Sequence, residues 1–322
     1  MNKINKLIIL IALAGVTSLV QAQVAYPTRT VRLIVPSSPG GGTDISARIL
    51  APQLTQFLGQ QVIVENRPGA GTMIGGEAVA RAAADGYTLL MGISTLAINP
   101  AMYKKVPYDA LKDLAPISQA VALSNVLVIH PSLPPRNLRE FIAFVKARPG
   151  QLNFASAGKG TSPHLSMELF LVLAKLNMLH VPYKGSGPGV TDLIAGHVPV
   201  MMPNMLSAQP HIKSGRLRAL GVTGTKRAPG AENIPTIAEA GVPGYEAVQW
   251  YGVLAPAGTP RDIIAKLHAG VVRALQNSDV RKRLMNDGAE PVGSSPEQFA
   301  TYIRAETEKW AKVIKAAGIV PN

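Results

Sequence analysis

The sequence predicts an α/β protein of two lobes, with a ligand cleft between them and two extended crossings that join the lobes. The chain has 322 residues with 47% hydrophobic content, enough for two ordinary domains. Strand-like and helix-like stretches alternate in both halves, which is typical of sheets covered by helices. Glycine-rich turns link such stretches in each half and indicate one ligand held from two sides.

The N-terminus has the features of a secretory signal peptide. The basic start 1–6 precedes the apolar run 7–20, which is short for a membrane anchor, and Ala22 is a small residue at a cleavage position. We expect residues 1–22 to be removed and the protein to reach the periplasm. The chain contains no cysteine, so we expect no lipid anchor, and disulfides and thiolate metal sites are excluded.

The first lobe begins with a strand at 30–34, a glycine-rich turn at 35–44 and a helix from Ile45. Glycines leave backbone N–H groups uncovered and a helix start adds unpaired ones, which suits an anion. The alternative is a tight turn in which Thr43 or Asp44 caps the helix. The charge of Asp44 argues against a bare phosphate site. The candidate binding residues here are Ser38, Gly40, Gly41, Gly42, Thr43 and Asp44.

A second and a third strand are expected at 61–65 and 87–92, with a helix at 73–84 between them. The three strands predict a parallel sheet, whose ligand lies beyond the carboxyl ends of the strands. The turns that follow them place Gly71, Ser94 and Thr95 at that edge. Capping of the next turn is the alternative for Ser94 and Thr95.

The second lobe repeats this pattern. A strand at 152–156 leads into a glycine-rich turn and a helix with Pro163 in its first turn. His164 is either a donor to an anionic ligand or a cap or surface residue. A third glycine-rich turn begins at Tyr183, and Asn204 opens a further helix. The candidate binding residues of this lobe are Ser156, Gly158, Gly160, Thr161, His164, Tyr183 and Asn204.

The chain is expected to cross between the lobes near Leu123–Ser124 and to return in a strand at 245–254, with the hinges near Leu123–Ser124 and Val248–Gln249. Three helices follow, and the last one shows Phe299, Ile303, Trp310 and Ile314 on one face. The resulting division is residues 23–123 and 248–322 for the discontinuous first domain and 124–247 for the second.

Composition and motifs argue against catalysis and nucleic-acid binding. The net charge of +13 either concentrates anionic small molecules or reflects a generally solvated basic surface. Basic residues are scattered and aromatic residues make up 5%, which disfavours nucleic acid. Neither a zinc-type histidine spacing nor a G-x-S-x-G motif occurs. We therefore predict no catalytic residues, no metal and no cofactor.

Motifs along the mature chain resemble the Bug family of periplasmic solute-binding proteins, the receptors of tripartite tricarboxylate transporters. The matching stretches are 31–36, 39–44, 65–71, 85–90, 160–165, 181–185 and 241–245. The resemblance implies a type II periplasmic-binding-protein fold that closes on a small carboxylate, with the turns at 36–44 and 157–164 gripping it through backbone groups and ordered water. It also implies an inner-membrane transporter as partner of a receptor that we take to be a monomer.

This sequence departs from the family pattern at two places. Ser37 and Ser38 stand where the family often has an aromatic and a small residue, and 202–204 reads Met-Pro-Asn where many members have Phe-Asp-Asn. The loss of that acidic side chain weakens the case for an amino-acid ligand. A dicarboxylate, a citrate-like acid and an aromatic acid stay open.

Two rival functions compete with a transport receptor. One is a periplasmic sensor that binds the same ligand and docks on a sensor-kinase ectodomain, which neighbouring genes would reveal. The other is a secreted enzyme acting on a carboxylate or phosphate, which turnover of a bound acid would reveal.

Overall fold

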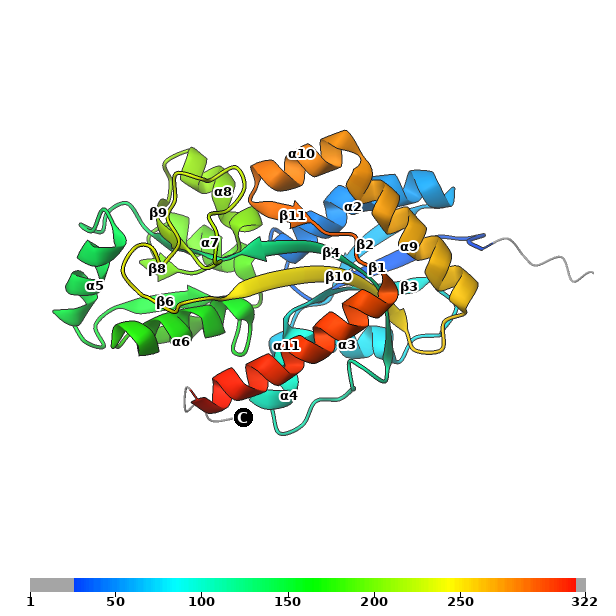
Figure 1. Ribbon diagram of the computed structural model, residues 1–322, viewed down its shortest axis with the longest axis horizontal. Helices are drawn as coiled ribbons and strands as arrows, with labels where there is room; N and C mark the ends of the chain where they lie inside the picture. The colour runs from blue at the N-terminus through cyan, green and yellow to red at the C-terminus, as the bar shows by residue number, and fades with distance from the viewer. Residues whose placement is uncertain (1–25, 317–322) are drawn as a thin grey trace, which may run out of the picture.

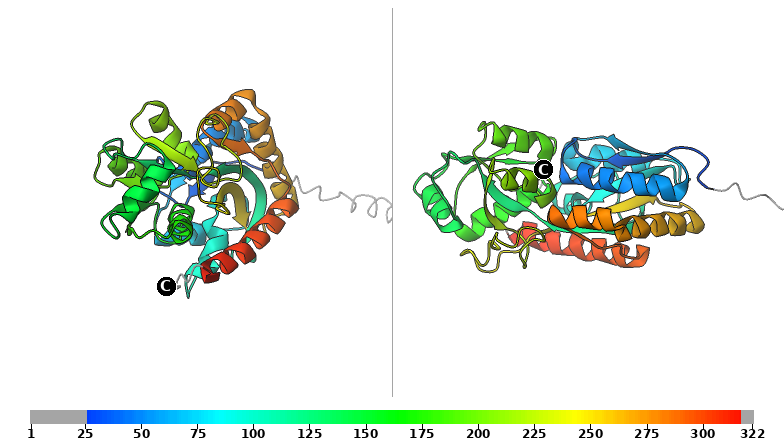
Figure 2. Two further views of the ribbon diagram at one scale, coloured as in Figure 1. Left: turned by 60° about the vertical axis from the view of Figure 1, so that its left-hand side comes forward. Right: turned by 90° about the horizontal axis from the view of Figure 1, so that it is seen from above.

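The computed structural model describes residues 26–316 and places them in two lobes, each built on its own sheet (Figure 1). Figure 2 shows the second lobe, drawn mainly in green, beside the first. The predicted signal peptide lies outside the described residues. Within residues 26–316, no helix is both long and apolar enough to cross a bilayer.

The first lobe is built on a six-stranded sheet in the order β11-β4-β10-β3-β1-β2. β1 pairs in parallel with β2 and β3, as predicted, whereas β10 runs antiparallel between β3 and β4. Its elements are β1 (Val31–Val35), α2 (Gly42–Leu58), β2 (Val62–Asn66), the 3-10 turn η1 (Ala70–Thr72), α3 (Met73–Ala80), β3 (Thr88–Ile93), α4 (Thr95–Met102), β4 (Leu114–Ser124), β10 (Val248–Pro256), α9 (Arg261–Gln276), α10 (Ser278–Asn286), β11 (Ala289–Pro291) and α11 (Pro296–Ala316).

The second lobe is built on a five-stranded sheet in the order β7-β6-β8-β5-β9. β6 pairs in parallel with β7 and β8, and β5 pairs antiparallel with β8 and β9. Its elements are β5 (Val126–Ile129), α5 (Leu138–Lys146), β6 (Asn153–Ser156), α6 (Ser162–Ala174), β7 (Leu179–Pro182), α7 (Ser186–Ile194), β8 (Val200–Met201), α8 (Met205–Lys213) and β9 (Arg218–Val222).

β4 and β10 lie side by side and carry the chain from one lobe to the other (Figure 1). At their ends near the second lobe, Ser124 pairs with Val248 and Leu123 with Gln249. The chain passes from β4 into β5 at Asn125, which is fully buried. Its amide nitrogen donates to the hydroxyls of Ser162 and Ser166, both at 2.9 Å, and so ties the crossing to the start of α6.

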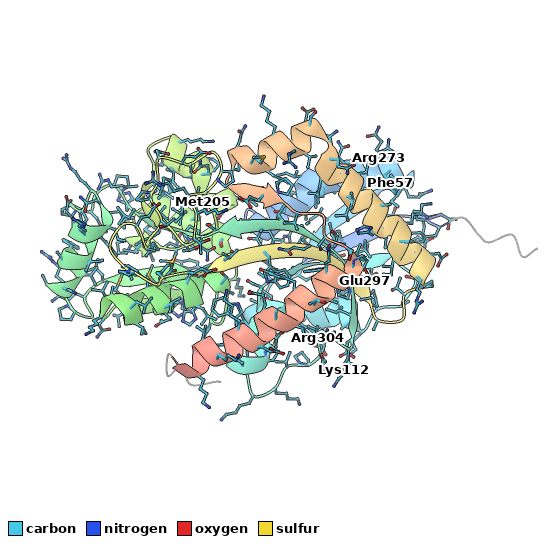
Figure 3. The ribbon with its side chains drawn as sticks, viewed as in Figure 1. Phe57, Lys112, Met205, Arg273, Glu297 and Arg304 are labelled. Carbon is cyan, nitrogen blue, oxygen red and sulfur yellow. The ribbon has the colours of Figure 1, made fainter. Side chains whose placement is uncertain are left out.

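The C-terminal helices pack on the first lobe. Arg273 of α9 lies beside Phe57 of α2, with its guanidinium carbon 5.9 Å from the ring centroid (Figure 3). α11 packs on α4 and β4, and Phe299 meets Trp250 edge-on at 5.3 Å between ring centroids. The apolar face expected for the last helix is confirmed, because its four residues named above are all at most 3% exposed.

The local structure differs from the expectations in two places. The helix expected at 73–84 ends at Ala80, since Ala82 N–H turns to the carbonyl of Val79 in a tighter last turn. β11 was not predicted, because three residues are too few to show a period.

Candidate functional site

A cavity of about 70 Å³ lies between the lobes. A single water needs roughly 10–15 Å³, so the space suits a small molecule or several waters. Residues of the predicted loops that line it are Gly41, Gly42, Thr43, Gly71, Gly158, Thr161, Tyr183 and Asn204. The structure thus brings candidates from both lobes to one place. Ser38, Gly40, Asp44, Ser94, Thr95, Ser156, Gly160 and His164 are not among the lining residues.

Helix starts from both lobes surround this cavity. α2 begins after Gly41, α6 after Thr161 and α7 after Gly185, and each of these three N-cap residues lines the cavity. None of the three caps its helix with a side-chain hydrogen bond. Their first N–H groups and the positive ends of their dipoles are therefore available to an anion.

The lining residues also set the charge of the cavity. They include no aspartate and no glutamate, and Lys184 is the only lysine or arginine among them. Tyr183 keeps its proton, since burial and the neighbouring Asp192 carboxylate raise its pKa to about 12. The arrangement can hold a small anion without a metal. Within the described part of the chain, no cluster of three or more metal-ligating side chains was found.

The first loop packs tightly against the opposite lobe. A Cβ atom added at Gly42 would lie 2.2 Å from Asn204 Oδ1 and 2.6 Å from the hydroxyl of Tyr251, so any larger residue would displace these side chains. Thr43 hydrogen-bonds Tyr251. Asn204 caps α8 by accepting from Ser207 N–H at 3.0 Å. These contacts hold in place the part of the cavity wall that Gly42, Thr43 and Asn204 form.

The proposed N-caps for the first helix are wrong, because Gly41 is the N-cap and Asp44 lies inside α2. Asp44 is 3% exposed and accepts from Gly40 N–H, Arg48 Nε and Asn66 Nδ2, all at 3.0 Å. Burial raises the pKa of Asp44, but these donors outweigh it and hold the pKa below its ordinary value. Arg48 neutralises the charge of Asp44. The Asp44 carboxylate thus holds the loop in its conformation without lining the cavity.

Ser38, Ser94 and Thr95 also lie away from the cavity lining. Ser38 contacts the second lobe, as described below. Ser94 and Thr95 are fully buried, and Ser94 precedes α4 without a side-chain capping bond. The Thr95 hydroxyl lies 2.5 Å from that of Thr72, which lines the cavity. Thr95 thus supports the turn that carries Gly71.

A stacked histidine pair lies behind the second loop. The rings of His164 and His180 are 4.1 Å apart between centroids, and His164 is 5% exposed. His164 is therefore not a surface residue. Its Nδ1 accepts from Gly160 N–H at 3.2 Å, and its Nε2 lies 3.5 Å from Glu168. The histidine pair supports the second loop and does not line the cavity.

Ser156 belongs to the same cluster. Its hydroxyl lies 2.6 Å from His180 Nε2 and accepts from Gly158 N–H at 3.0 Å. A serine beside a histidine is also the pairing found in nucleophilic catalysis. Ser156 is fully buried, however, and does not line the cavity, so in this arrangement it positions Gly158.

The two lobes touch around the cavity. Ser38 donates to the carbonyl of Lys184 from its backbone N–H at 3.2 Å and from its hydroxyl at 2.5 Å. Tyr103 donates to the carbonyl of Lys159 at 2.8 Å. Each bond joins the first lobe to a loop of the second, so the structure represents a closed arrangement.

Sequence reasoning missed several lining residues, including Ser37, Ser186, Gln249 and Tyr251. Ser186 lies in the glycine-rich turn that was recognised but represented only by Tyr183. Gln249 gave one signal, because it is a lone uncharged polar residue in an otherwise apolar and aromatic strand. Ser37 lies in the predicted turn at 35–44 but was not named as a candidate. Tyr251 gave no signal, since its place depends on how the lobes meet.

The chain is similar to known proteins over most of its length. Residues 46–319 match the family model described as tripartite tricarboxylate transporter family receptor. Protein BugT of Bordetella pertussis is 42% identical over 312 residues, which cover 96% of this chain and 95% of the relative.

Two solved structures are also similar. A Rhodopseudomonas palustris protein with adipate is 38% identical, with a TM-score of 0.90, and the match covers 92% of this chain and 100% of that one. MatC from the same organism, with bound malate, is 35% identical, with a TM-score of 0.85 and coverages of 90% and 100%.

Proposed function

The chain belongs to the tripartite tricarboxylate transporter receptor family, and from that membership we propose that it is a periplasmic receptor for a small organic carboxylate. In this proposal the protein is a secreted monomer without enzymatic activity. It closes on its ligand and delivers it to a membrane transporter. Solved relatives with adipate and with malate support a carboxylate ligand.

One observation carries the proposal. Three uncapped helix starts from two lobes meet at a cavity whose lining includes no carboxylate side chain. A carboxylate there accepts hydrogen bonds from backbone N–H groups and lies at the positive ends of several helix dipoles. Ordered water would let the same scaffold serve acids of different length. The buried position of Ser156 supports binding without turnover.

A thermal-shift screen of organic acids tests the proposal. A ligand at 100 times its Kd adds about 2.7 kcal/mol to the free energy of unfolding. We expect at least one di- or tricarboxylate to raise the unfolding temperature, and its neutral amide, such as succinamide for succinate, to leave it unchanged. If no carboxylate in a panel of mono-, di- and tricarboxylic acids raised it, the proposal would be wrong.

A further inference from the structure

Two polar side chains at the cavity have no hydrogen-bond partner. The hydroxyl of Ser37 and the Oε1 atom of Gln249 are buried and unpaired, while both residues line the cavity. Ser37 is 8% exposed and Gln249 is 2% exposed, so bulk water does not reach them freely. Buried polar groups are nearly always paired, and an exception at a binding site indicates a missing partner.

Their neighbours in the lining are paired, which makes the two stand out. Tyr183 donates to Asp192 at 2.7 Å, and Thr161 donates to the carbonyl of Gly158 at 2.6 Å. Asn204 Oδ1 accepts from Ser207. The lining residues therefore carry two kinds of polar groups: helix N–H groups that suit a carboxylate, and the unpaired side-chain atoms of Ser37 and Gln249, which are buried in the wall of the cavity.

The unpaired oxygen of Gln249 limits the chemistry of its partner. The unpaired atom is the amide oxygen, which only accepts, so a ligand group that pairs with it must offer an N–H or an O–H. A carboxylate offers neither. An ammonium group would be buried without a counter-charge, because the lining includes no aspartate or glutamate, and such burial is costly. A neutral hydroxyl satisfies the acceptor without that penalty.

We propose that the ligand is a hydroxy-substituted carboxylic acid whose hydroxyl donates to Gln249 Oε1 and contacts Ser37. This inference rests on the proposed function, since it assigns the carboxylate to the helix starts. Gln249 is suited to the role because it lies on β10 and pairs with Leu123 of β4, on the ribbon that joins the lobes. Gln249 would thus select the ligand by its hydroxyl.

Calorimetric titration with matched acids tests the inference. Malate and succinate differ only by a hydroxyl, as do citrate and tricarballylate, and aspartate replaces the hydroxyl of malate by an ammonium. We expect the hydroxy acid of the binding pair to bind about 10- to 100-fold more tightly, which corresponds to one buried acceptor left unpaired. Aspartate should bind more weakly than malate.

Two variants locate the effect. Gln249→Leu keeps the size of the side chain, and we expect it to bring the hydroxy acid close to its unsubstituted partner in affinity. Ser37→Ala should likewise reduce the difference in affinity between the hydroxy acid and its unsubstituted partner. Ser46→Ala is the matched control, because the Ser46 hydroxyl is also buried and unpaired but does not line the cavity. That variant should keep the full gap.

The outcomes separate the two proposals. Three results would overturn the inference and leave the proposed carboxylate receptor intact. The two acids of a pair could bind with equal affinity, the difference in affinity could persist in both variants, or only acids without a hydroxyl could bind. If no acid of the whole thermal-shift panel binds to protein that circular dichroism shows to be folded, the proposed function itself fails. A gap that closes in Gln249→Leu and persists in Ser46→Ala upholds both.

Discussion

Gly187 of the second lobe packs so closely against Pro39 of the first loop that a Cβ atom on Gly187 would lie 2.2 Å from the carbonyl oxygen of Pro39. The obstacle is backbone, which cannot move aside as a flexible side chain can. Gly187 lies in the first turn of α7, beside the bonds from Ser38 to Lys184. Closure of the two lobes therefore depends on the missing side chain.

We predict that Gly187→Ala weakens ligand binding roughly tenfold or more while the protein still folds. Overpacking costs about 1–3 kcal/mol, and the penalty falls on the closed state alone because separated lobes leave room for the methyl group. Calorimetry with the acid found by the thermal-shift screen measures it. Unchanged affinity in Gly187→Ala would mean that the ligand does not need this contact.

Gly41→Val should weaken binding far more than folding. Gly41 lines the cavity and precedes α2, and a branched side chain there covers N–H groups that would face the ligand. Its φ of −79° lies in a region that valine adopts, and the nearest heavy atom to an added Cβ is 3.5 Å away. The backbone therefore tolerates the change. Calorimetry that returned wild-type affinity would remove the first loop from the anion site.

The histidine pair predicts a pH dependence of stability. Burial, with further lowering by the neighbouring His164 and Lys159 and opposition from Glu168, brings the pKa of His180 down to about 4. The unfolded chain binds the proton near pH 6.5, so between pH 6.5 and 4 it holds more protons than the folded protein at this site. Stability from this group is thus complete above pH 6.5 and declines as the pH falls toward 4.

Thermal unfolding of His180→Gln beside the wild type isolates this contribution. Glutamine does not titrate and can still hydrogen-bond Ser156. Carboxylates that titrate in the same range affect both proteins, so the difference in unfolding temperature reports the histidine. As the pH falls from 6.5 to 4, we expect the unfolding temperature of the wild type to fall relative to that of the variant. A difference that stayed constant over this range would contradict the assigned pKa.

The signal peptide is tested by mass. Cleavage after Ala22 predicts a mature protein that begins at Gln23, since a basic start and a short apolar run precede a small residue at the cleavage position. Intact-mass measurement on a periplasmic extract should give the mass of residues 23–322. A species that retained residues 1–22 would refute the expectation.

Local turn chemistry made much of this site predictable. The loops with Gly41 and Gly158 were found because strand, glycine and helix start follow each other within a few residues. The roles of Asp44 and His164 were not, because their partners Asn66 and His180 come from other strands. Gln249 needed the closed lobes as well: only the packing of both around β10 turns a polar residue in a strand into an unpaired group at a cavity.

Closure by hinge motion is the last prediction. We expect the hinges near Leu123–Ser124 and Val248–Gln249, where the ribbon of β4 and β10 passes between the lobes and β11 also pairs with β4 at Leu123. A ligand that touches both lobes favours the closed state through its differential contacts, whereas one that touches a single lobe cannot. Small changes in φ and ψ at the ribbon suffice to separate the loops. Ligand-free protein should thus open the contacts of Ser38 with Lys184.

Small-angle scattering with and without saturating acid measures this motion. The wild type should show a smaller radius of gyration when the ligand is bound. Gly187→Ala adds a second comparison, because its methyl group would meet the carbonyl of Pro39. The radius of gyration of this variant should decrease less than that of the wild type when ligand is added to saturation. Identical scattering curves for the wild type in both states would favour a rigid, preformed cavity. The contacts between the lobes would then not report ligand binding to a transporter.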